Sequence, residues 1–471
     1  MGPLELSKLL NECAAPNDGR TKRLRAAIRS AVATGELTAG EVLPSTRAAA
    51  AGLGMSRNSV QDAYEALVAE GVIKTARGRP PIILNVPQVP HTALPASRIR
   101  ISDRGEALAD NLVGHGTRSV NALSPGLPDP DLFPHDQWAR ILRRAARTRY
   151  DEAENYAEYH GHSSLRSALA KHLLQTRGVR VSPDNILITT GTQTAARLVT
   201  SLTTDAGDTA LVEDPGYGGA RAVLRSMGVR LRPLTDADLP SARLAYVTPS
   251  TQYPTGTRMP MQHRQSLLAW ALRENAVILE DDYDSDFVWQ HRDIPPLFAL
   301  DQNQCVFMLG TASKSLLPSL RIGWLVLPDG MRDIAVRAHR TLGLAANLHV
   351  QSALAQFIDE GLYARHVRRT AEIYRERKDV LVANLKATLS DQISVSEPEG
   401  GLQLMVTFHE AIDDNRLVTA MRLKGYHPLP LSSLSLEAKM AGIVVGFAGA
   451  TNERARGFST LLAKLMKTSL V

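Results

Sequence analysis

A lysine lies between two apolar, strand-like segments of this sequence, residues 305–309 and 322–327. Solvated lysines occur mostly on helix faces and exposed turns, so a lysine between buried strands is a candidate for chemistry. The amine of a lysine can form a Schiff base with a carbonyl group, and we expect Lys314 to have this role. Nearby hydroxyl and guanidinium groups could bind a phosphate, because arginine offers a fork of hydrogen-bond donors. The expected phosphate ligands are Thr311, Ser313 and Arg321.

A second group of polar residues follows the strand-like segment 276–279. Residues two apart in an extended chain share a face, so Asp281 and Tyr283 can both point into a pocket at the carboxyl end of a parallel sheet. An ionised Asp281 would keep a pyridine nitrogen protonated, and the Tyr283 hydroxyl could bond a phenolic oxygen on the same ring. An acidic surface loop is the alternative interpretation of this segment.

Two further segments complete a set that suits pyridoxal 5′-phosphate (PLP). A strand-like segment and a glycine turn precede a helix predicted to begin near Thr194, so the amides of Thr192 and Gln193 would face an anion. Tyr217 follows a Pro-Gly turn and could pack against a flat ring, or it could be an ordinary packed tyrosine. PLP needs a Schiff-base lysine, a carboxylate at its pyridinium nitrogen, phosphate donors and a group against its ring. These residues supply a candidate for each.

The elements that must position these residues alternate along the chain from Leu132 onward. Apolar segments typical of strands are separated by helical patterns, which predicts an α/β domain with a mainly parallel sheet. The strand-like segments are 186–189, 209–212, 244–247, 276–279, 305–309 and 322–327.

The first 85 residues show a different pattern, short helices followed by a hairpin. Apolar residues recur at helical spacing over residues 22–33, and Ser45 and Ser56 are suited to N-cap a second and a third helix. After Gly71, two strand-like segments enclose a basic tip that contains glycine. This order predicts a winged helix-turn-helix domain.

The third helix of this domain has the character of a recognition helix. Such a helix offers polar and basic side chains in its first turn, while its other face packs on the domain core. The expected apolar face consists of Val60, Ala63, Tyr64, Leu67 and Val68. The residues expected to contact double-stranded DNA are Ser45, Arg47, Ser56, Arg57, Asn58, Ser59, Arg77, Gly78 and Arg79. Each arginine alone could be a solvated surface charge, but the combination with a basic hairpin favours DNA binding.

Charge and composition agree with a small DNA-reading head on a larger domain. The chain has 471 residues and a net charge of +6, of which +3 falls in residues 1–85. No segment approaches the roughly 18 consecutive apolar residues of a membrane span. Residues 1–13 lack the pattern of a secretory signal, and Cys13 and Cys305 form no disulfide framework, so we expect a cytoplasmic protein. No metal site is expected.

A segment with several prolines and little apolar periodicity separates the winged helix-turn-helix from the α/β domain. This pattern predicts a linker over residues 86–120. The expected domains are therefore a DNA-binding domain over residues 1–85 and a PLP-binding domain over residues 121–471.

Several of these segments resemble known families. The segments LPSTR (43–47), SRNSV (56–60) and AYEAL (63–67) resemble the GntR-type winged helix. The chain from Leu123 onward resembles fold-type I aminotransferases. More narrowly, EDPGY (213–217), TPSTQYPTG (248–256) and EDDYDS (280–285) resemble the MocR-type regulators, which join these two domains through a variable linker. The resemblance implies a homodimer built mainly on the aminotransferase-like domains, with two DNA-binding heads that read two half-sites.

Two positions depart from the aminotransferases. Tyr253 stands where those enzymes have an asparagine before Pro-Thr-Gly, so the bond to the phenolic oxygen falls to Tyr283, with Gln252 also a candidate cofactor contact. Gly442 aligns with the arginine that holds the substrate carboxylate in the enzymes. Without that partner an amino acid should be poorly oriented, unless another arginine such as Arg221 compensates.

The expected function is a PLP-dependent transcriptional regulator rather than an enzyme. PLP would be held on Lys314, and PLP itself or a small amine or amino acid would control DNA binding, with the missing arginine favouring PLP. A working aminotransferase with a DNA-binding tether is the alternative. A DNA-binding scaffold with an inactive pocket is a third, disfavoured by the retained pocket residues.

Overall fold

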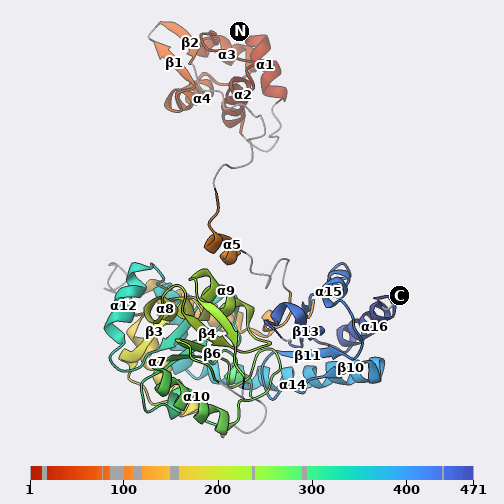
Figure 1. Cartoon of the computed structure of the whole chain (residues 1–471). Helices are drawn as coiled ribbons and strands as arrows, with labels where there is room; N and C mark the ends of the chain where they lie inside the picture. Colours follow the sequence, from red (N-terminus) through yellow and green to blue (C-terminus); the bar gives the residue numbers. More distant parts are fainter. Residues whose placement is uncertain are drawn as a thin grey trace. The chain divides into compact units, whose positions relative to one another are not determined.

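The computed structural model describes residues 2–12, 19–76, 78–84, 100–109, 119–148, 159–235, 239–288, 294–437 and 440–469. The chain forms two compact units, Met1–Arg100 and Ile101–Val471 (Figure 1). Within the described ranges, no helix combines the length and the apolar character that crossing a bilayer requires.

In the N-terminal unit, helices and a two-stranded hairpin surround one apolar core. The elements are α1 (Pro3–Glu12), α2 (Arg20–Thr34), α3 (Thr46–Leu53), α4 (Arg57–Ala69), β1 (Ile73–Ala76) and β2 (Arg79–Ile83). Helix α2 buries the predicted apolar stripe, which includes Leu24 and Ile28, and ends at Gly35 in the left-handed conformation. Helix α1 was not predicted, although its Leu6 is fully buried in this core.

The predicted caps of α3 and α4 are confirmed. The Oγ of Ser45 accepts a hydrogen bond of 3.2 Å from the amide of Ala48, and the Oγ of Ser56 accepts one of 3.0 Å from the amide of Ser59. Val68, expected on the apolar face of α4, is instead 40% exposed. The buried stripe of α4 is narrower than predicted and consists of Val60, Ala63, Tyr64 and Leu67.

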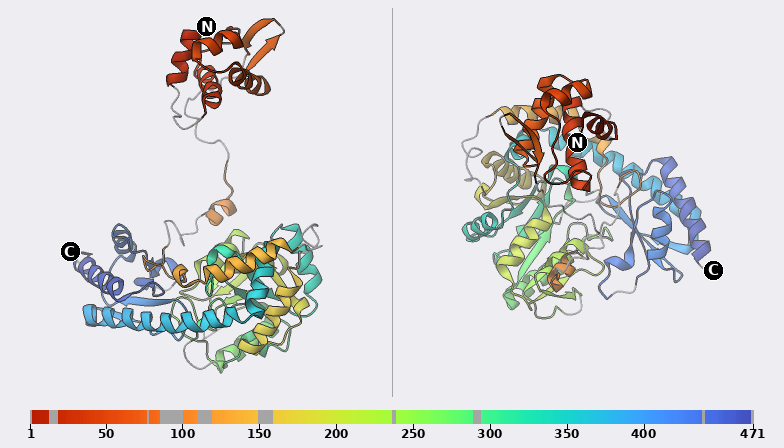
Figure 2. Two further views of the ribbon diagram at one scale, coloured as in Figure 1. Left: turned by 180° about the vertical axis from the view of Figure 1, so that it is seen from behind. Right: turned by 90° about the horizontal axis from the view of Figure 1, so that it is seen from above.

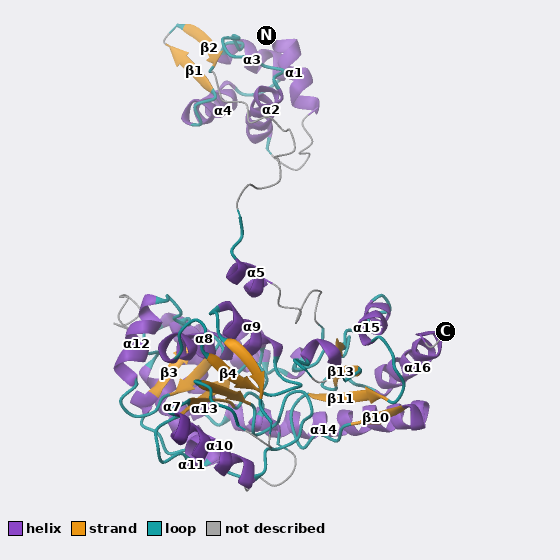
Figure 3. Ribbon diagram, in the orientation of Figure 1, coloured by secondary structure: helices purple, strands orange, loops and turns teal. Residues whose placement is uncertain are grey.

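In the second unit, a seven-stranded sheet confirms the predicted α/β fold (Figure 3). Its strands are β3 (Ile186–Thr189), β4 (Thr209–Val212), β5 (Arg230–Pro233), β6 (Leu244–Val247), β7 (Val277–Asp281), β8 (Val306–Thr311) and β9 (Gly323–Val326). Their order is β3-β9-β8-β7-β6-β4-β5, with β9 antiparallel to both neighbours and the pairs from β5 to β8 parallel. The sequence did not indicate β5, an edge strand on which exposed arginines alternate with half-buried residues.

Helices cover both faces of this sheet. Neighbouring residues of β7 show this, because Leu279 packs in one apolar cluster with residues of α8 and α9, and Ile278 packs in another with residues of α10. The helices are α6 (His135–Arg147), α7 (Ser163–Arg177), α8 (Thr192–Thr203), α9 (Gly218–Ser226), α10 (Met261–Glu274), α11 (Leu297–Leu300), α12 (Arg332–Thr341) and α13 (Leu348–Asp359).

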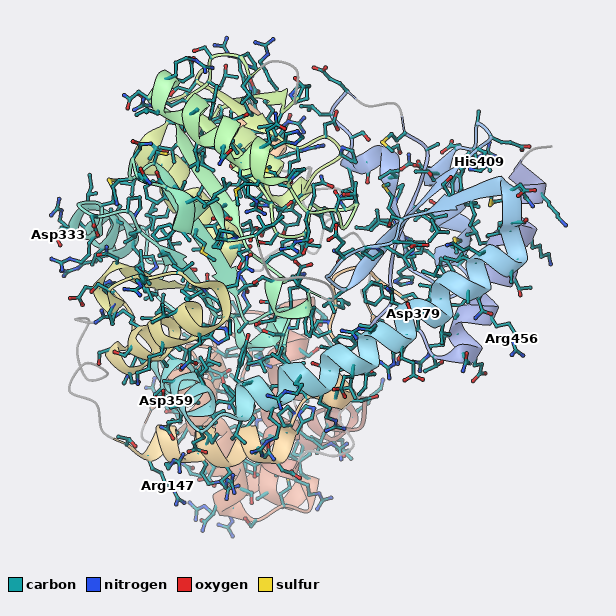
Figure 4. The ribbon with its side chains drawn as sticks, turned by 90° about the horizontal axis from the view of Figure 1, so that it is seen from below. Arg147, Asp333, Asp359, Asp379, His409 and Arg456 are labelled. Carbon is teal, nitrogen blue, oxygen red and sulfur yellow. The ribbon has the colours of Figure 1, made fainter. Side chains whose placement is uncertain are left out.

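A smaller antiparallel sheet with the strand order β10-β11-β13-β12 follows toward the C-terminus. The strands of this sheet are β10 (Ile393–Val395), β11 (Gln403–Phe408), β12 (Leu429–Pro430) and β13 (Gly442–Gly446). The helices of this part of the chain are α14 (Leu362–Leu389), α15 (Asp414–Arg422) and α16 (Asn452–Ser469). The long helix α14 runs from the larger sheet to the smaller one, as both views in Figure 2 show. Charged side chains such as Asp333 on α12, Asp359 on α13 and Arg456 on α16 point outward into solvent (Figure 4).

The stretch expected to be a linker contains one described helix, α5 (Asp103–Ala109). Helix α5 packs against α9 of the large unit (Figure 1). Part of the stretch between the two domains is therefore attached to the surface of the second unit.

Candidate cofactor cavity and DNA-binding face

A cavity of about 180 Å³ lies at the carboxyl ends of the parallel strands, next to the last residues of β7 and β8. Ligands of open α/β sheets bind at this edge. All of the predicted cofactor residues except Gln252 line the cavity, namely Thr192, Gln193, Tyr217, Asp281, Tyr283, Thr311, Ser313, Lys314 and Arg321. The structure thus brings together side chains from segments that are far apart in the sequence.

Lys314 lies just after β8, where the chain turns before β9. Its side chain is half-buried, and its Nζ donates a hydrogen bond of 2.8 Å to the carbonyl oxygen of Gly126. Gly126 has a left-handed φ of +68°, and a Cβ added there would lie 2.9 Å from the Nζ. A glycine is therefore required where the backbone approaches the lysine.

One corner of the cavity has the features of an anion site. Helix α8 begins at Thr192, and its N-cap residue, Gly191, has no side chain to cap the first amides. Both terminal nitrogens of Arg321 lie within 3.9 Å of the position that a Cβ on Gly191 would take. A hydroxyl pair stands at the end of β8, where the Oγ1 of Thr311 donates 3.0 Å to the Oγ of Ser313. Amides at the start of a helix, a guanidinium and hydroxyls together are a phosphate-binding set.

Asp281 lines the cavity with a buried carboxyl group, and one hydrogen bond holds this group in place. Its Oδ2 accepts a hydrogen bond from the hydroxyl of Tyr246, whereas its Oδ1 is buried and has no partner among the described residues. Burial raises the pKa of Asp281 to about 7, against the hydrogen bond from Tyr246, which lowers it. The unpartnered oxygen is available for a donor inside the cavity.

Three tyrosines form the apolar wall. The ring centroid of Tyr253 lies 5.8 Å from that of Tyr217 and 6.4 Å from that of Tyr283, both in edge-to-face orientation. The hydroxyl of Tyr283 donates 3.1 Å to the carbonyl of Thr251. The bond from Tyr283 to a cofactor oxygen therefore stays a prediction, since the proton of this hydroxyl already has an acceptor.

Gln252 does not line the cavity. Its Nε2 donates hydrogen bonds of 2.7 Å to the carbonyls of Pro215 and Tyr253, and its Oε1 accepts from Thr255. The amide of Gln252 thus connects two loops, and its groups are bonded to neighbouring protein atoms rather than turned to a ligand.

Arg221, the arginine expected to compensate for the missing one, is also engaged elsewhere. Arg221 is 5% exposed, donates 2.7 Å to the carbonyl of Glu213 and forms an ion pair of 3.4 Å with Asp214. It does not line the cavity. Burial lowers the pKa of Arg221, and Asp214 partly opposes this.

Gly442, the position expected to align with the carboxylate-binding arginine of the enzymes, lies on β13. A Cβ on Gly442 would lie 2.2 Å from the carbonyl oxygen of Val406, so no side chain fits at this position. Two residues along β13, Val444 packs in the apolar cluster that contains Tyr253. The residue that this strand presents toward the tyrosine wall is therefore a valine.

Several site residues had no clear signal in the sequence. Gly126 and Gln403 line the cavity from outside the segments discussed above, and Tyr246 lies within an apolar strand. The buried carboxylate of Glu213 accepts hydrogen bonds from the amide (3.0 Å) and the hydroxyl (2.6 Å) of Thr248, a further lining residue.

In the N-terminal unit, the predicted DNA contacts lie on α3, α4 and the hairpin. Arg47, Arg57, Asn58, Gly78 and Arg79 are exposed. Ser45 and Ser56 use their hydroxyls as caps, and the Oγ of Ser59 bonds that of Ser56 at 2.8 Å. Arg77 lies outside the described residues.

Comparison with known proteins gives the same two parts. Residues 20–82 match the family of bacterial regulatory proteins named gntR, and residues 129–454 match aminotransferase class I and II. The probable rhizopine catabolism regulatory protein MocR of Rhizobium meliloti is 36% identical over 442 residues, which cover 91% of this chain and 90% of that protein. The pyridoxine biosynthesis transcriptional regulator PdxR of Corynebacterium glutamicum is 30% identical, with 86% of each chain covered.

Solved structures of aminotransferases resemble the second unit. The kynurenine aminotransferase of Pyrococcus horikoshii, in complex with PMP, has a TM-score of 0.68 and 25% identity over 79% of this chain and 96% of its own. LysN, the α-aminoadipate aminotransferase of Thermus thermophilus, has a TM-score of 0.68 and 26% identity over 74% and 93%. The chain therefore belongs to the MocR-type regulators of the gntR family, which join a GntR winged helix to an aminotransferase class I and II domain.

Proposed function

We propose that this protein is a transcriptional regulator that binds PLP on Lys314 and senses a small molecule in the same cavity. The observation that carries the proposal is the buried Oδ1 of Asp281, which lines the cavity and has no partner among the described residues. A buried carboxylate oxygen without a donor is costly, and a protonated pyridine nitrogen would satisfy it. The pyridinium charge would also hold Asp281 in its ionised form.

The other lining residues fit the remaining parts of this cofactor. Arg321, the amides at the start of α8, and the hydroxyls of Thr311 and Ser313 would bind the phosphate. Tyr217 would pack against the ring. PLP, when bound, supplies a carbonyl carbon that reacts reversibly with amines. The carbonyl of Gly126 would orient the amine of Lys314 by accepting a hydrogen bond from it.

The cavity supports sensing over transamination. Among the described residues that line it, Arg321 is the single arginine, and its place beside the start of α8 suits the phosphate. No lining guanidinium then remains to clamp an α-carboxylate, and loss of such a clamp costs the orientation that catalysis needs. MocR and PdxR, which match nearly the whole chain, are named as regulators, and this supports the same choice.

A route from the cavity toward the DNA-binding unit is available through α9. Tyr217, which lines the cavity, immediately precedes α9, and α5 packs on that helix. A ligand that moved Tyr217 would act on the helix that holds the end of the linker. Such a ligand controls DNA binding only by its difference in affinity between two arrangements. We propose that the protein acts as a homodimer whose two winged helices bind two DNA half-sites.

Reduction of the PLP-loaded protein with borohydride, followed by peptide mapping, tests the cofactor assignment. The label is expected on Lys314, absent from Lys314→Ala, and retained in Lys171→Ala, a matched change at an exposed lysine of α7. A label elsewhere would refute the proposal. Stoichiometric release of keto acid from added amino acids would instead support the aminotransferase alternative.

A further inference from the structure

The side chain of Gln403 carries a hydrogen-bond acceptor inside the cavity to which the cofactor proposal assigns no role. Gln403 begins β11, lines the cavity and is 1% exposed. Its Oε1 is buried and has no partner among the described residues. A buried amide oxygen without a donor is unfavourable, so a ligand that supplied a donor would gain affinity from filling this place.

The orientation of this amide follows from its neighbour. The hydroxyl of Tyr283 has one proton and donates it to the carbonyl of Thr251 at 3.1 Å, so it can only accept from Gln403. The Nε2 of Gln403 makes that donation at 3.2 Å. A flipped amide would put its oxygen against the oxygen of Tyr283 without a proton between them. The oxygen of Gln403 is therefore the free end.

This acceptor lies close to the reactive lysine. The position that a Cβ on Gly126 would take is 2.9 Å from the Nζ of Lys314 and 3.5 Å from the Oε1 of Gln403. A small amine bound in place of the lysine amine could therefore reach Gln403 through a spacer of about two or three carbons.

The two acceptors at this corner disfavour a carboxylate. The oxygen of Gln403 and the carbonyl of Gly126 are both acceptors, and a ligand carboxylate at this distance would face them without a donor. Arg221 is bound to Asp214, and β13 contributes Val444 to the tyrosine wall. The arrangement selects against the second polar group that an amino acid would bring.

We propose that the effector is a small primary amine whose second polar group is a hydrogen-bond donor, either a hydroxyl or an ammonium, and that Gln403 recognises this group. The effector then lacks a carboxylate. This inference rests on the proposed function, because it takes the amine to bind at the PLP-loaded Lys314, and it identifies the chemical class of the sensed molecule.

A matched pair of ligands tests this specificity on the full-length, PLP-loaded protein. Propanolamine and β-alanine share the amine and the three-carbon chain and differ in the terminal hydroxyl or carboxylate. Isothermal titration calorimetry is expected to give a Kd for propanolamine at least about tenfold lower than that for β-alanine. Diaminopropane is expected to behave like propanolamine.

Two variants assign the preference to Gln403. Gln403→Leu should raise the Kd for propanolamine about tenfold and reduce the discrimination, whereas Gln403→Glu should bind diaminopropane more tightly than the wild type does. The visible spectrum of bound PLP is recorded for each sample first, so failure of cofactor binding is seen separately. Equal or tighter binding of β-alanine, no binding of propanolamine, or unchanged ligand affinities in both variants would overturn the inference.

Discussion

The amine of Lys314 is hydrogen-bonded at 2.8 Å to the carbonyl oxygen of Gly126, a residue 188 positions earlier in the chain. This contact connects the turn after β8 with the segment that precedes α6. It places the amine inside the cavity and gives it an acceptor, so the lysine is oriented by backbone rather than by a flexible side chain. The left-handed φ of Gly126, +68°, makes the approach possible.

Replacement of Gly126 by alanine should impair cofactor loading. The new Cβ would lie 2.9 Å from the Nζ of Lys314 and would displace the amine, so we expect the Kd for PLP to rise about tenfold. Gly178→Ala is the matched control, because Gly178 has nearly the same φ, +67°, but has no atom within 4 Å of the added Cβ. Spectrophotometric titration measures both. Equal PLP affinities in the two variants would contradict the role of the Gly126 contact.

The raised pKa of Asp281 predicts a pH dependence of stability in the PLP-free protein. Burial raises the pKa values of Asp281, Glu213 and Glu280 to about 7, whereas unfolded carboxyls titrate near about 4. The native state therefore binds more protons between about pH 4 and about pH 7, and the free energy of unfolding falls as the pH rises through this range.

Asp281→Asn removes one of these three ionisations. We expect a shallower fall in Tm between pH 5 and pH 8, and at pH 8 a gain over the wild type of up to about 4 kcal/mol in the free energy of unfolding. Asp333→Asn is the control, because Asp333 is exposed and its pKa is lowered by Arg332. Differential scanning calorimetry across this range provides the measurement. Parallel curves for wild type and Asp281→Asn would rule out the assigned titration.

Arg321 should contribute to affinity for the phosphate and not for the rest of the cofactor. Its φ of +51° is left-handed, so asparagine, which tolerates this conformation, is the suitable replacement. Arg321→Asn should weaken PLP binding by about ten- to a hundredfold and leave the binding of pyridoxal, which has no phosphate, nearly unchanged. Arg197→Asn, at an exposed arginine of α8, is the control. An equal loss for PLP and pyridoxal would show that the arginine acts on the fold instead.

Local patterns were sufficient to predict most of the cavity. Asp281, Tyr283, Thr311 and Lys314 come at or just after the ends of buried parallel strands, and such ends converge at one edge of a sheet. The winged helix was predictable for a related reason, because caps such as Ser56 and apolar spacing along α4 are local features.

The parts that could not be predicted depend on tertiary contacts. Gly126 and Gln403 reach the cavity from segments whose own sequence indicates no ligand. Gln252 was a reasonable candidate by position, but its amide nitrogen donates hydrogen bonds to the backbone carbonyls of Pro215 and Tyr253. On β13, the sequence could not decide which residue faces the site, because the register that pairs Gly442 with Thr407 is a property of the folded sheet.

The exposed first turn of α4 predicts the outcome of a DNA-binding test. Arg57 is the first residue of α4, is exposed, and stands next to the Ser56 cap, so its side chain can reach bases or phosphates. The DNA site for this test is one that the wild-type protein selects from a random library. Arg57→Ala should weaken binding to this site at least about tenfold. It should also make the slope of log affinity against log salt concentration shallower by about one. Arg29→Ala, at an exposed arginine of α2 outside the predicted contact set, should stay within about twofold of wild type. Fluorescence anisotropy over a salt series measures both, and the PLP spectrum should be the same in each. Unchanged DNA affinity in Arg57→Ala would refute α4 as the recognition helix. An equal loss in both variants would show that Arg57 contributes only through its positive charge and not through a specific contact.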